Sequence, residues 1–320
     1  MYGFNGRLSE LFPSQLMVDI TEVCNLGCIH CTHPVFKTSK VYAKSMLDPK
    51  LNQKAVDEIE KHGKNLTKYI RYTSNGEPLV HPKSYEMIQY AVDNSGTKVT
   101  LTTNGTLLNE KKMTRLLDTG LHMIDISLDA FEENTYEKVR VGGDLKITKK
   151  NVLKIIDLKK KTNSKTKIIV SFVEQKQNSN EIENFKKFWR ENGADEVLIR
   201  KLHTNSGDKV DHLKNDTKKD VIQKRKPCLY PWERIVLTAK GFLSFCPTDW
   251  YGKSVINDYR KTTIKDLWNC DFYKDLRSQH LSNNFTNKFC LQCPDWANTS
   301  WPMDKNKSYA DLVERLLYEN

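Results

Sequence analysis

The hydrophobic positions in the first two hundred residues follow two alternating spacings. Short runs rich in β-branched and aromatic residues indicate buried strands, and between them apolar residues return every three or four positions, as along amphipathic helices. We expect strands at 15–21, 69–73, 98–102, 123–127, 167–172 and 196–200. We expect helices at 49–62, 84–93, 109–119, 145–160 and 181–192. This alternation predicts βα units around a parallel sheet, and six units are too few for a closed eight-stranded barrel.

The pattern changes after about residue 205. Residues 206–227 are polar and charged without apolar periodicity, and we interpret them as a linker. A hairpin pattern follows, with strands at 232–237 and 242–245, and the chain ends in an amphipathic segment at 309–318. We therefore predict an α/β domain over 1–205 and a smaller domain over 228–320.

Length and charge exclude several classes of protein. A chain of 320 residues can bury a sizeable core, no apolar run approaches the roughly 18 residues of a membrane span, and the first residues lack a signal-peptide core. We expect a cytoplasmic protein with no membrane partner. The net charge of +11 comes from lysines spread over helix-like stretches, without interleaved stacking aromatics. This pattern favours a solvated surface over a nucleic-acid partner.

The stretch Cys24-Asn25-Leu26-Gly27-Cys28-Ile29-His30-Cys31 follows the first expected strand directly. Three thiolates at this spacing can hold three corners of a [4Fe–4S] cluster and leave one iron open to a substrate or cofactor. His30 and His33 keep a zinc site as an alternative.

A second set of cysteines lies in the smaller predicted domain. Cys228, Cys246, Cys290 and Cys293 are enough to saturate one [4Fe–4S] cluster, and a structural zinc ion is the alternative for the same four thiolates. Cys270 is left over.

The CxxxCxxC spacing resembles the signature of the radical S-adenosylmethionine (radical SAM) superfamily. The resemblance implies a partial (β/α)6 barrel, open on one side. It also implies that the open iron binds the amino and carboxylate groups of SAM, and that one electron cleaves SAM to methionine and a 5′-deoxyadenosyl radical.

Three further motifs each close an expected strand and extend the resemblance. Asn75-Gly76-Glu77-Pro78 is similar to the family's Gly-Gly-Glu motif, which binds the methionine amino group, with Asn75 in place of its first glycine. Ser127 and Arg140 match the family positions that contact the SAM carboxylate, and Asn104 ends the third strand on the same face. The cofactor-binding residues thus implied are Gly76, Glu77, Asn104, Ser127 and Arg140.

The second cysteine set resembles the SPASM/twitch extension of that superfamily, in its form with one auxiliary cluster. Relatives of this type include an aminocyclitol dehydrogenase, which passes the second electron of an alcohol oxidation to the auxiliary cluster. Our leading hypothesis is a similar oxidation of a sugar-like or cyclitol alcohol, with a flavodoxin- or ferredoxin-like electron donor. Arg200 and His203, at the end of the sixth strand, are the catalytic candidates because a cationic side chain would help the hydroxyl to lose its proton.

Three other functions stay open at this point. The chain is a candidate maturase of a ribosomally made peptide. It is also a candidate epimerase, in which a free thiol such as Cys270 returns hydrogen to a carbon radical. From a different class comes a basic, zinc-stapled module that binds nucleic acid without catalysis.

Overall fold

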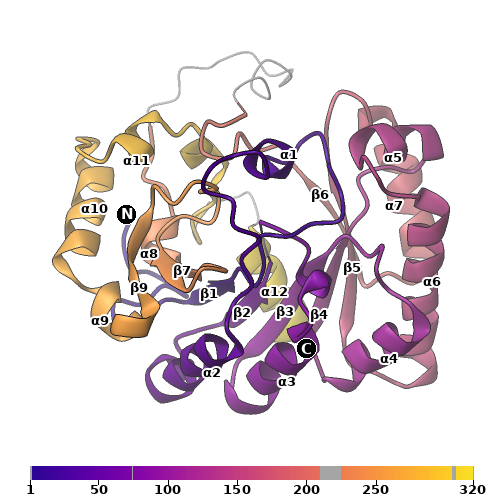
Figure 1. Cartoon of the computed structure of the whole chain (residues 1–320), viewed down its shortest axis with the longest axis horizontal. Helices are drawn as coiled ribbons and strands as arrows, with labels where there is room; N and C mark the ends of the chain where they lie inside the picture. The colour runs from indigo at the N-terminus through magenta and orange to yellow at the C-terminus, as the bar shows by residue number, and fades with distance from the viewer. Residues whose placement is uncertain (1, 74, 210–224, 305–307, 320) are drawn as a thin grey trace.

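A single mixed sheet organises the chain. The computed structural model describes residues 2–73, 75–209, 225–304 and 308–319. Within these residues the sheet has nine strands in the order β6-β5-β4-β3-β2-β1-β7-β8-β9. In Figure 1 the strands β3 to β6 lie to the right of β1, and β7 and β9 lie to its left. The strands are β1 (Gln15–Val18), β2 (Tyr69–Tyr72), β3 (Lys98–Thr103), β4 (Met123–Ser127), β5 (Lys167–Val173), β6 (Glu196–Arg200), β7 (Arg234–Leu237), β8 (Phe242–Ser244) and β9 (Val255–Asp258).

The six expected strands of the first domain are confirmed, and they pair in parallel as the βα alternation predicts. The hairpin is also confirmed, as β7 and β8. Its position was not predicted, because β7 pairs in parallel with β1 and continues the same sheet beyond the barrel strands. Hydrophobic alternation identifies a strand but not its partner, so the sequence pattern could not show this pairing.

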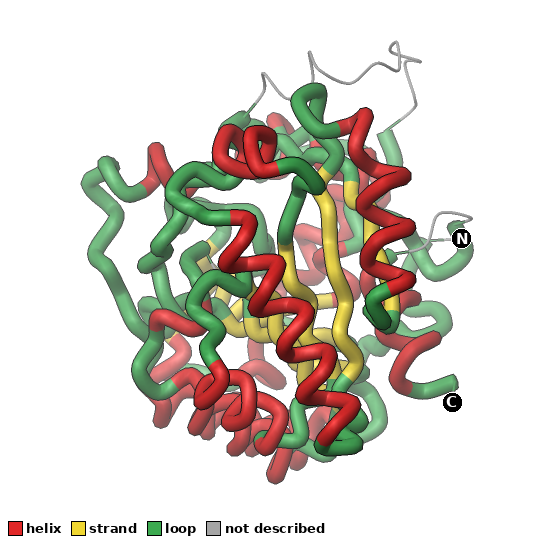
Figure 2. The backbone as a smooth tube through the Cα atoms, turned by 90° about the vertical axis from the view of Figure 1, so that its right-hand side faces the viewer, coloured by secondary structure: helices red, strands yellow, loops and turns green. Residues whose placement is uncertain are grey.

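Helices connect the strands and cover the sheet, and the long ones of the barrel half lie outside its strands (Figure 2). In the first part of the chain they are α1 (His33–Phe36), α2 (Pro49–Glu58), α3 (Ser84–Asn94), α4 (Glu110–Asp118), α5 (Glu133–Val139), α6 (Leu145–Lys161) and α7 (Ile182–Glu191). In the last part they are α8 (Tyr230–Glu233), α9 (Ile264–Trp268), α10 (Asp271–Ser282), α11 (Lys288–Gln292) and α12 (Tyr309–Leu317). Side-chain caps define several starts: Asp48, Asn109 and Asp144 each accept a hydrogen bond from an amide in the first turn of α2, α4 and α6.

The two faces of the barrel sheet differ in polarity. Fully buried aliphatic residues such as Ile70, Val99 and Ile124 belong to the main core. Side chains one position along the same strands include Arg71 and Asp125 and point to the opposite face, because successive side chains of a strand alternate. The barrel therefore has an apolar outer layer under its helices and a polar inner face.

The C-terminal helix α12 packs against the amino-terminal ends of the barrel strands. Its apolar residues form a second, smaller core with Tyr69, Met123 and Ile169 of β2, β4 and β5. A capping box starts the helix at Ser308, and Arg7 binds Asp311 in its first turn at 2.7 Å. The expected amphipathic segment at 309–318 is thus confirmed, and it forms the floor of the barrel.

The predicted linker of residues 206–227 lies largely outside the described residues, which stop at 209 and resume at 225. The division of the chain into two domains on either side of this linker stays a prediction. The described residues 205–209 form turns that contact both halves of the molecule, as shown below.

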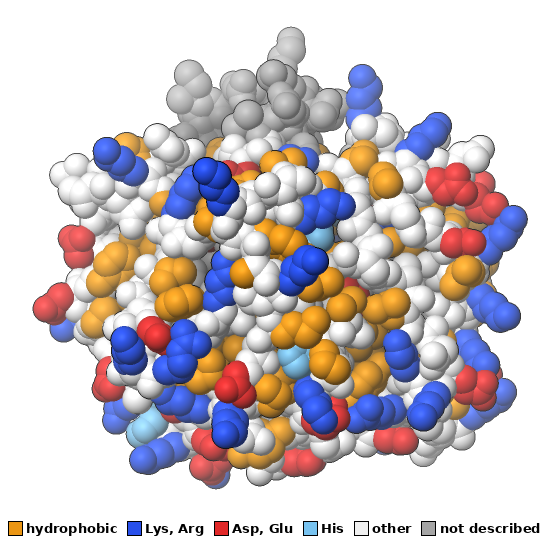
Figure 3. All heavy atoms as spheres, in the orientation of Figure 1, with side chains coloured by type: hydrophobic (Ala, Val, Ile, Leu, Met, Phe, Trp, Pro, Cys, Tyr) orange, Lys and Arg blue, Asp and Glu red, His pale blue; other side chains and the backbone are white. Residues whose placement is uncertain are grey.

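On the face of the molecule shown in Figure 3, Lys and Arg side chains are scattered among acidic ones and do not form a single basic stripe. Searching the helices that the structure describes for a stretch long and apolar enough to cross a membrane finds none.

His122, between β3 and β4, provides a test of the fold by pH. Its Nδ1 accepts a hydrogen bond from the Val99 amide at 3.1 Å, and burial, helped by Lys98, lowers its pKa to about 4. In the unfolded chain His122 has a pKa of about 6.5, so it becomes protonated at a pH where it is still neutral in the native state. The free energy of unfolding therefore falls as the pH drops from 6.5 towards 4. We expect His122→Asn to remove about 1 kcal/mol of the destabilisation seen between pH 6.5 and 5. Urea unfolding of both proteins across this range measures it, and an equal pH dependence of the two would contradict the assignment.

Candidate active site

The loop that carries the first three cysteines is held against the end of α5. The amide of Gly27 donates to the Val141 carbonyl at 2.8 Å, and that of Ile29 to the Val139 carbonyl at 3.0 Å. The loop follows β1, so it lies at the carboxyl ends of the parallel strands, where sites form in such sheets.

The environment of the three thiols suits an iron–sulfur cluster. The sulfur of Cys24 accepts from the Leu26 amide at 3.5 Å, and that of Cys31 from the His33 amide at 3.4 Å. Burial raises the pKa of Cys24 to about 11 and that of Cys31 to about 12. The thiols therefore hold their protons until a metal displaces them. Three soft sulfur donors without a fourth in the loop fit a cluster with one open corner.

The two histidines that kept a zinc site open have other partners. His33 is buried, and its Nε2 lies 2.9 Å from the Glu22 carbonyl oxygen. The Nε2 of His30 lies 3.5 Å from the Asp129 carboxylate. Within the described part of the chain, no group of three or more His, Cys, Asp or Glu side chains converges closely enough to hold a single metal ion.

The Gly-Glu turn after β2 is pressed against the cluster loop. A Cβ on Gly76 would lie 2.2 Å from the Val23 carbonyl oxygen, so only glycine fits there. The buried carboxylate of Glu77 accepts from the Thr103 hydroxyl at 2.6 Å and from the Asn104 amide at 2.7 Å, and burial raises its pKa. Glu77 thus joins the ends of β2 and β3, and its contact with the SAM amino group stays a prediction.

Asn104 links this turn to the cluster loop. Its side-chain amide donates to the Asn25 side chain at 2.9 Å, and Asn25 donates to the Thr106 hydroxyl at 2.8 Å. The structure thereby brings together three of the motifs that the sequence singled out: the cysteine loop, the Gly-Glu turn and the end of the third strand.

Arg140 lies beside the cluster loop and is already paired. Its Nε donates to Asp129 at 2.8 Å, and its positive charge favours the thiolate form of Cys28 and so lowers the pKa of that thiol against the effect of burial. Burial lowers the pKa of Arg140, but Asp129 and Cys28 outweigh it, so the pKa lies above its usual value. The hydroxyl of Ser127 contacts that of Ser171 at 3.4 Å. A SAM-carboxylate contact for Ser127 and Arg140 stays a prediction, and the structure adds a role for Arg140 as a cation next to Cys28.

The four cysteines of the second set meet in one cavity. Cys228, Cys246, Cys290 and Cys293 all line it, together with the aromatic side chains of Tyr230, Phe245, Phe289 and Trp296. The cavity measures about 30 Å³. Burial raises the pKa of Cys246 to about 11, so these thiols too are protonated without a metal. Four sulfur donors around one apolar cavity fit a fully ligated cluster.

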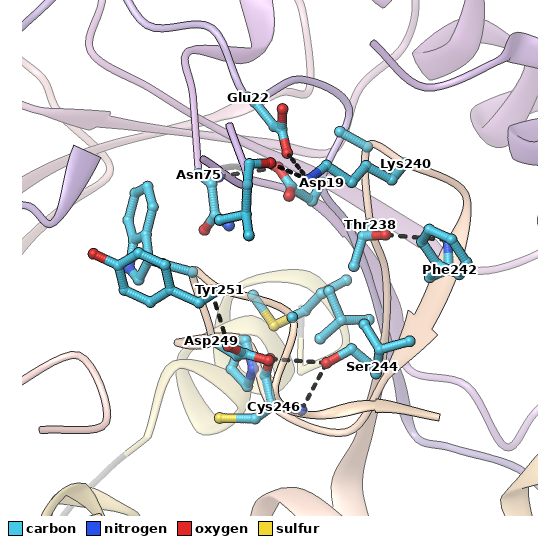
Figure 4. A pocket seen from close by; sticks show the side chains of 18 of the residues that line it. Asp19, Glu22, Asn75, Thr238, Lys240, Phe242, Ser244, Cys246, Asp249 and Tyr251 are labelled. Atoms are coloured by element: carbon cyan, nitrogen blue, oxygen red, sulfur yellow. Dashed lines mark hydrogen bonds and ion pairs between the residues drawn. The ribbon is translucent and has the colours of Figure 1, made fainter. Parts of the chain in front are cut away.

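A larger pocket of about 200 Å³ lies between the barrel and the auxiliary half (Figure 4). Asp19 and Asn75, at the ends of β1 and β2, form one side of it, and Asp249 and Tyr251 lie across from them. Cys246 lines this pocket as well as the cavity of the four cysteines. The wall between the two spaces is therefore made partly by one ligand of the second set.

Sequence reasoning missed several residues of this pocket. Glu22 and Lys240, which pair at 3.2 Å across the two halves, and the buried Trp250 all line it. Asp19 has a signal that was overlooked: it directly follows a predicted buried strand, where the strand-end rule places functional groups. The others become neighbours only through the β1–β7 pairing.

Arg200 and His203 are placed differently from the expectation. Arg200 forms an ion pair with the fully buried Asp125, which Arg71 also approaches at 3.6 Å. Burial lowers the pKa of His203, which makes it neutral at pH 7 rather than cationic. Neither residue belongs to the lining of the pocket around Asn75, so their catalytic role stays a prediction without support from that pocket.

Cys270 stands at the start of α10 as its N-cap residue, packed against the main core. The linings of the two spaces that contain Cys246 do not include it. We expect Cys270→Ala to leave product formation within about twofold of wild type and to cost about 1 kcal/mol of stability, as small core truncations do. Product yield and thermal unfolding measured together check this, and loss of product in a folded variant would restore the thiol to catalysis.

Two family models match the chain. That of the radical SAM superfamily matches residues 18–188, and that of the SPASM iron–sulfur cluster-binding domain matches residues 228–294. A probable GTP 3′,8-cyclase of Methanococcus maripaludis is 34% identical over 144 residues, which are 44% of this chain and 45% of that protein. The chain thus spans about half the length of this curated relative.

Solved structures with the same fold cover most of the chain. BtrN in complex with AdoMet and 2-DOIA has a TM-score of 0.54 at 17% identity and covers 83% of this chain and 86% of its own. Streptococcus suis SuiB bound to precursor peptide SuiA has a TM-score of 0.66 at 15% identity, over 88% of this chain and 70% of its own. The iron–sulfur assignments of both family models overturn the zinc alternatives and, with them, the zinc-stapled nucleic-acid module.

Proposed function

We propose that this chain, which belongs to the radical SAM superfamily, oxidises a sugar-like or cyclitol alcohol and passes one electron of that oxidation to its auxiliary cluster. The observation that carries the proposal is the double position of Cys246. It lines both the 200 Å³ pocket, which Asn75 of the Gly-Glu turn also lines, and the cavity of the second cysteine set. A substrate in that pocket is separated from the auxiliary site by a ligand of that site, which suits electron transfer out of the substrate.

The two cysteine sets and the pocket residues divide the chemistry between them. Cys24, Cys28 and Cys31 would hold the first cluster, and Cys228, Cys246, Cys290 and Cys293 the second. When bound, the first cluster supplies one electron that splits SAM into methionine and a 5′-deoxyadenosyl radical, which takes a hydrogen atom from the carbinol carbon. The substrate radical then loses one proton, for which the Asp19 carboxylate is placed at the pocket wall, and one electron towards Cys246. A ketone and 5′-deoxyadenosine are the products.

The lining of the pocket suits a polyhydroxylated substrate. Asn75 and Thr73 offer hydrogen-bonding groups, and Trp250 and Tyr251 offer aromatic faces on which the apolar side of a sugar-like ring can pack. The electron donor that we propose for this reaction is a low-potential flavodoxin- or ferredoxin-like protein.

Anaerobic incubation with SAM, a chemical reductant and a panel of cyclitols, aminocyclitols and sugars tests the proposal. We expect one 5′-deoxyadenosine per ketone for the right substrate. Formation of 5′-deoxyadenosine without ketone for every alcohol in the panel would contradict the proposed alcohol oxidation. Peptide substrates in the same panel separate alcohol oxidation from peptide modification, and inversion of a carbon centre without a ketone would identify an epimerase.

A further inference from the structure

A turn over residues 204–207 reaches from the end of the barrel to the second cysteine set. Asn205 and Ser206 both have left-handed backbone, with φ of 51° and 59°. Two consecutive non-glycine residues in this region are strained, and such strain persists only where surrounding contacts hold it. The holding group is the buried Asp295, two residues beyond Cys293.

Asp295 fixes the turn with both of its carboxylate oxygens. Oδ1 accepts from the amide and the hydroxyl of Thr204, each at 2.9 Å, and Oδ2 accepts from the amide of Ser206 at 2.8 Å. On the other side of the turn, the side-chain amide of Asn205 donates to the His30 carbonyl at 3.4 Å, within the first cysteine loop. The turn is thus tied to the loops of both cysteine sets.

The strained turn places the Ser206 hydroxyl close to the Thr248 hydroxyl and to the sulfur of Cys246. Ser206 is hydrogen-bonded to the Thr248 hydroxyl, Thr248 Oγ1 lies 3.3 Å from the sulfur of Cys246, and Ser206 Oγ lies 3.6 Å from it. A coordinated thiolate carries no proton, so the hydroxyl must donate in any O–H···S contact. Thr248 Oγ1 is the nearer of the two hydroxyl oxygens to the sulfur, so we assign Thr248 as the donor to Cys246. The single Thr248 proton is then used, and Ser206 donates to the Thr248 oxygen.

We propose that Ser206 and Thr248 are positioning residues that raise the reduction potential of the auxiliary cluster and so set it to accept the substrate's electron. This rests on the proposed function for its purpose, but the effect on the potential exists without any substrate. Each added electron makes the cluster sulfurs more negative, so a hydrogen bond to Cys246 stabilises the reduced state more than the oxidised one. The bond from Ser206 polarises the Thr248 hydroxyl and strengthens its donation. The placement on Cys246 matters because this ligand faces the pocket.

Redox titration followed by electron paramagnetic resonance, on the anaerobic holoenzyme without substrate, tests this inference. The auxiliary signal is the one that does not change when SAM is added, since SAM has an open iron only at the first cluster. We expect Ser206→Ala/Thr248→Val to weaken reduction of the auxiliary cluster about tenfold, which lowers its midpoint by about 59 mV for one electron. Thr248→Val and Ser206→Ala alone should each give part of this shift, and Thr248→Ser should keep the wild-type midpoint.

Thr238→Val is the matched control. Thr238 lines the same pocket, but its hydroxyl accepts from the Phe242 amide at 3.1 Å and serves the β7–β8 turn. The midpoint potential of the auxiliary cluster in Thr238→Val should equal that of wild type. If Thr248→Val fails to take up the cluster, the Ser206→Ala variant, which keeps the direct Thr248 contact, decides. Unchanged midpoints in the hydroxyl variants, or an equal shift in Thr238→Val, overturn the inference. Failure of the alcohol panel would instead overturn the proposed function and leave the midpoint result standing.

Discussion

Replacing Cys246 with alanine should separate SAM cleavage from ketone formation. The variant keeps Cys24, Cys28 and Cys31, so 5′-deoxyadenosine should still form at a rate within a few-fold of wild type. The second set loses one of its four ligands, and the iron content should fall from about eight to about four per chain. Without the auxiliary cluster the substrate radical has no electron acceptor beside the pocket, so the ketone yield should fall to background. Iron and sulfide analysis with product quantification on one anaerobic preparation gives all three values.

Cys28→Ala is the matched reverse experiment. It should abolish SAM cleavage and ketone together while about four irons remain in the second set. Wild-type ketone yield in the Cys246 variant would show that the auxiliary site takes no part in the oxidation. Loss of SAM cleavage in the same variant would show that the two sites are not separable in this way.

A methyl group on Gly76 should disrupt the molecule more than its size suggests. The new Cβ would meet the carbonyl oxygen of Val23 at 2.2 Å and its carbonyl carbon at 2.7 Å. Both are backbone atoms directly before Cys24, so relief requires the cluster loop itself to move. We expect Gly76→Ala to lose about 3 kcal/mol of stability, at the upper end for overpacking, and to lose most iron from the first site.

Gly27→Ala is the control for that variant. Gly27 lies inside the cluster loop, yet a Cβ there would meet its nearest neighbour, the Val141 carbonyl oxygen, at 3.8 Å, an ordinary contact. This variant should keep its iron and its unfolding midpoint within measurement error. Urea unfolding and iron content of the two variants, compared side by side, decide whether the close approach at Gly76 holds the loop. Similar behaviour of both would refute it.

The barrel strands and the first cysteine loop could be predicted because each is encoded within one short segment of the sequence. The strands from β1 to β6 are short β-branched runs, and the cysteine spacing of the first loop is a chemical signature by itself. The pairing of β7 with β1 joins positions far apart in the chain, as Gln15 with Arg234, and no periodicity encodes that. The pocket was missed for the same reason, because Asp19 and Lys240 become neighbours only after this pairing.

Polar residues were the hardest to assign from sequence. The position of Arg200 at a strand end indicates catalysis, but its guanidinium forms an ion pair with the buried Asp125 of β4, two strands away in the sheet. The sequence pattern assigns Ser206 to a polar linker, because a polar and charged stretch without apolar periodicity usually indicates a solvated segment. Its fixed position depends on Asp295, a residue whose role is visible only in three dimensions.

The floor made by α12 has a consequence for the order in which the molecule is built. The ribosome releases β2, β4 and β5 well before α12, yet Tyr69, Met123 and Ile169 complete their packing only against that helix. During synthesis the barrel is therefore open from below as well as at its mouth, and its polar inner face is wet. When α12 packs, it expels that water, so a chamber built by the barrel strands is closed by a helix that is translated after them.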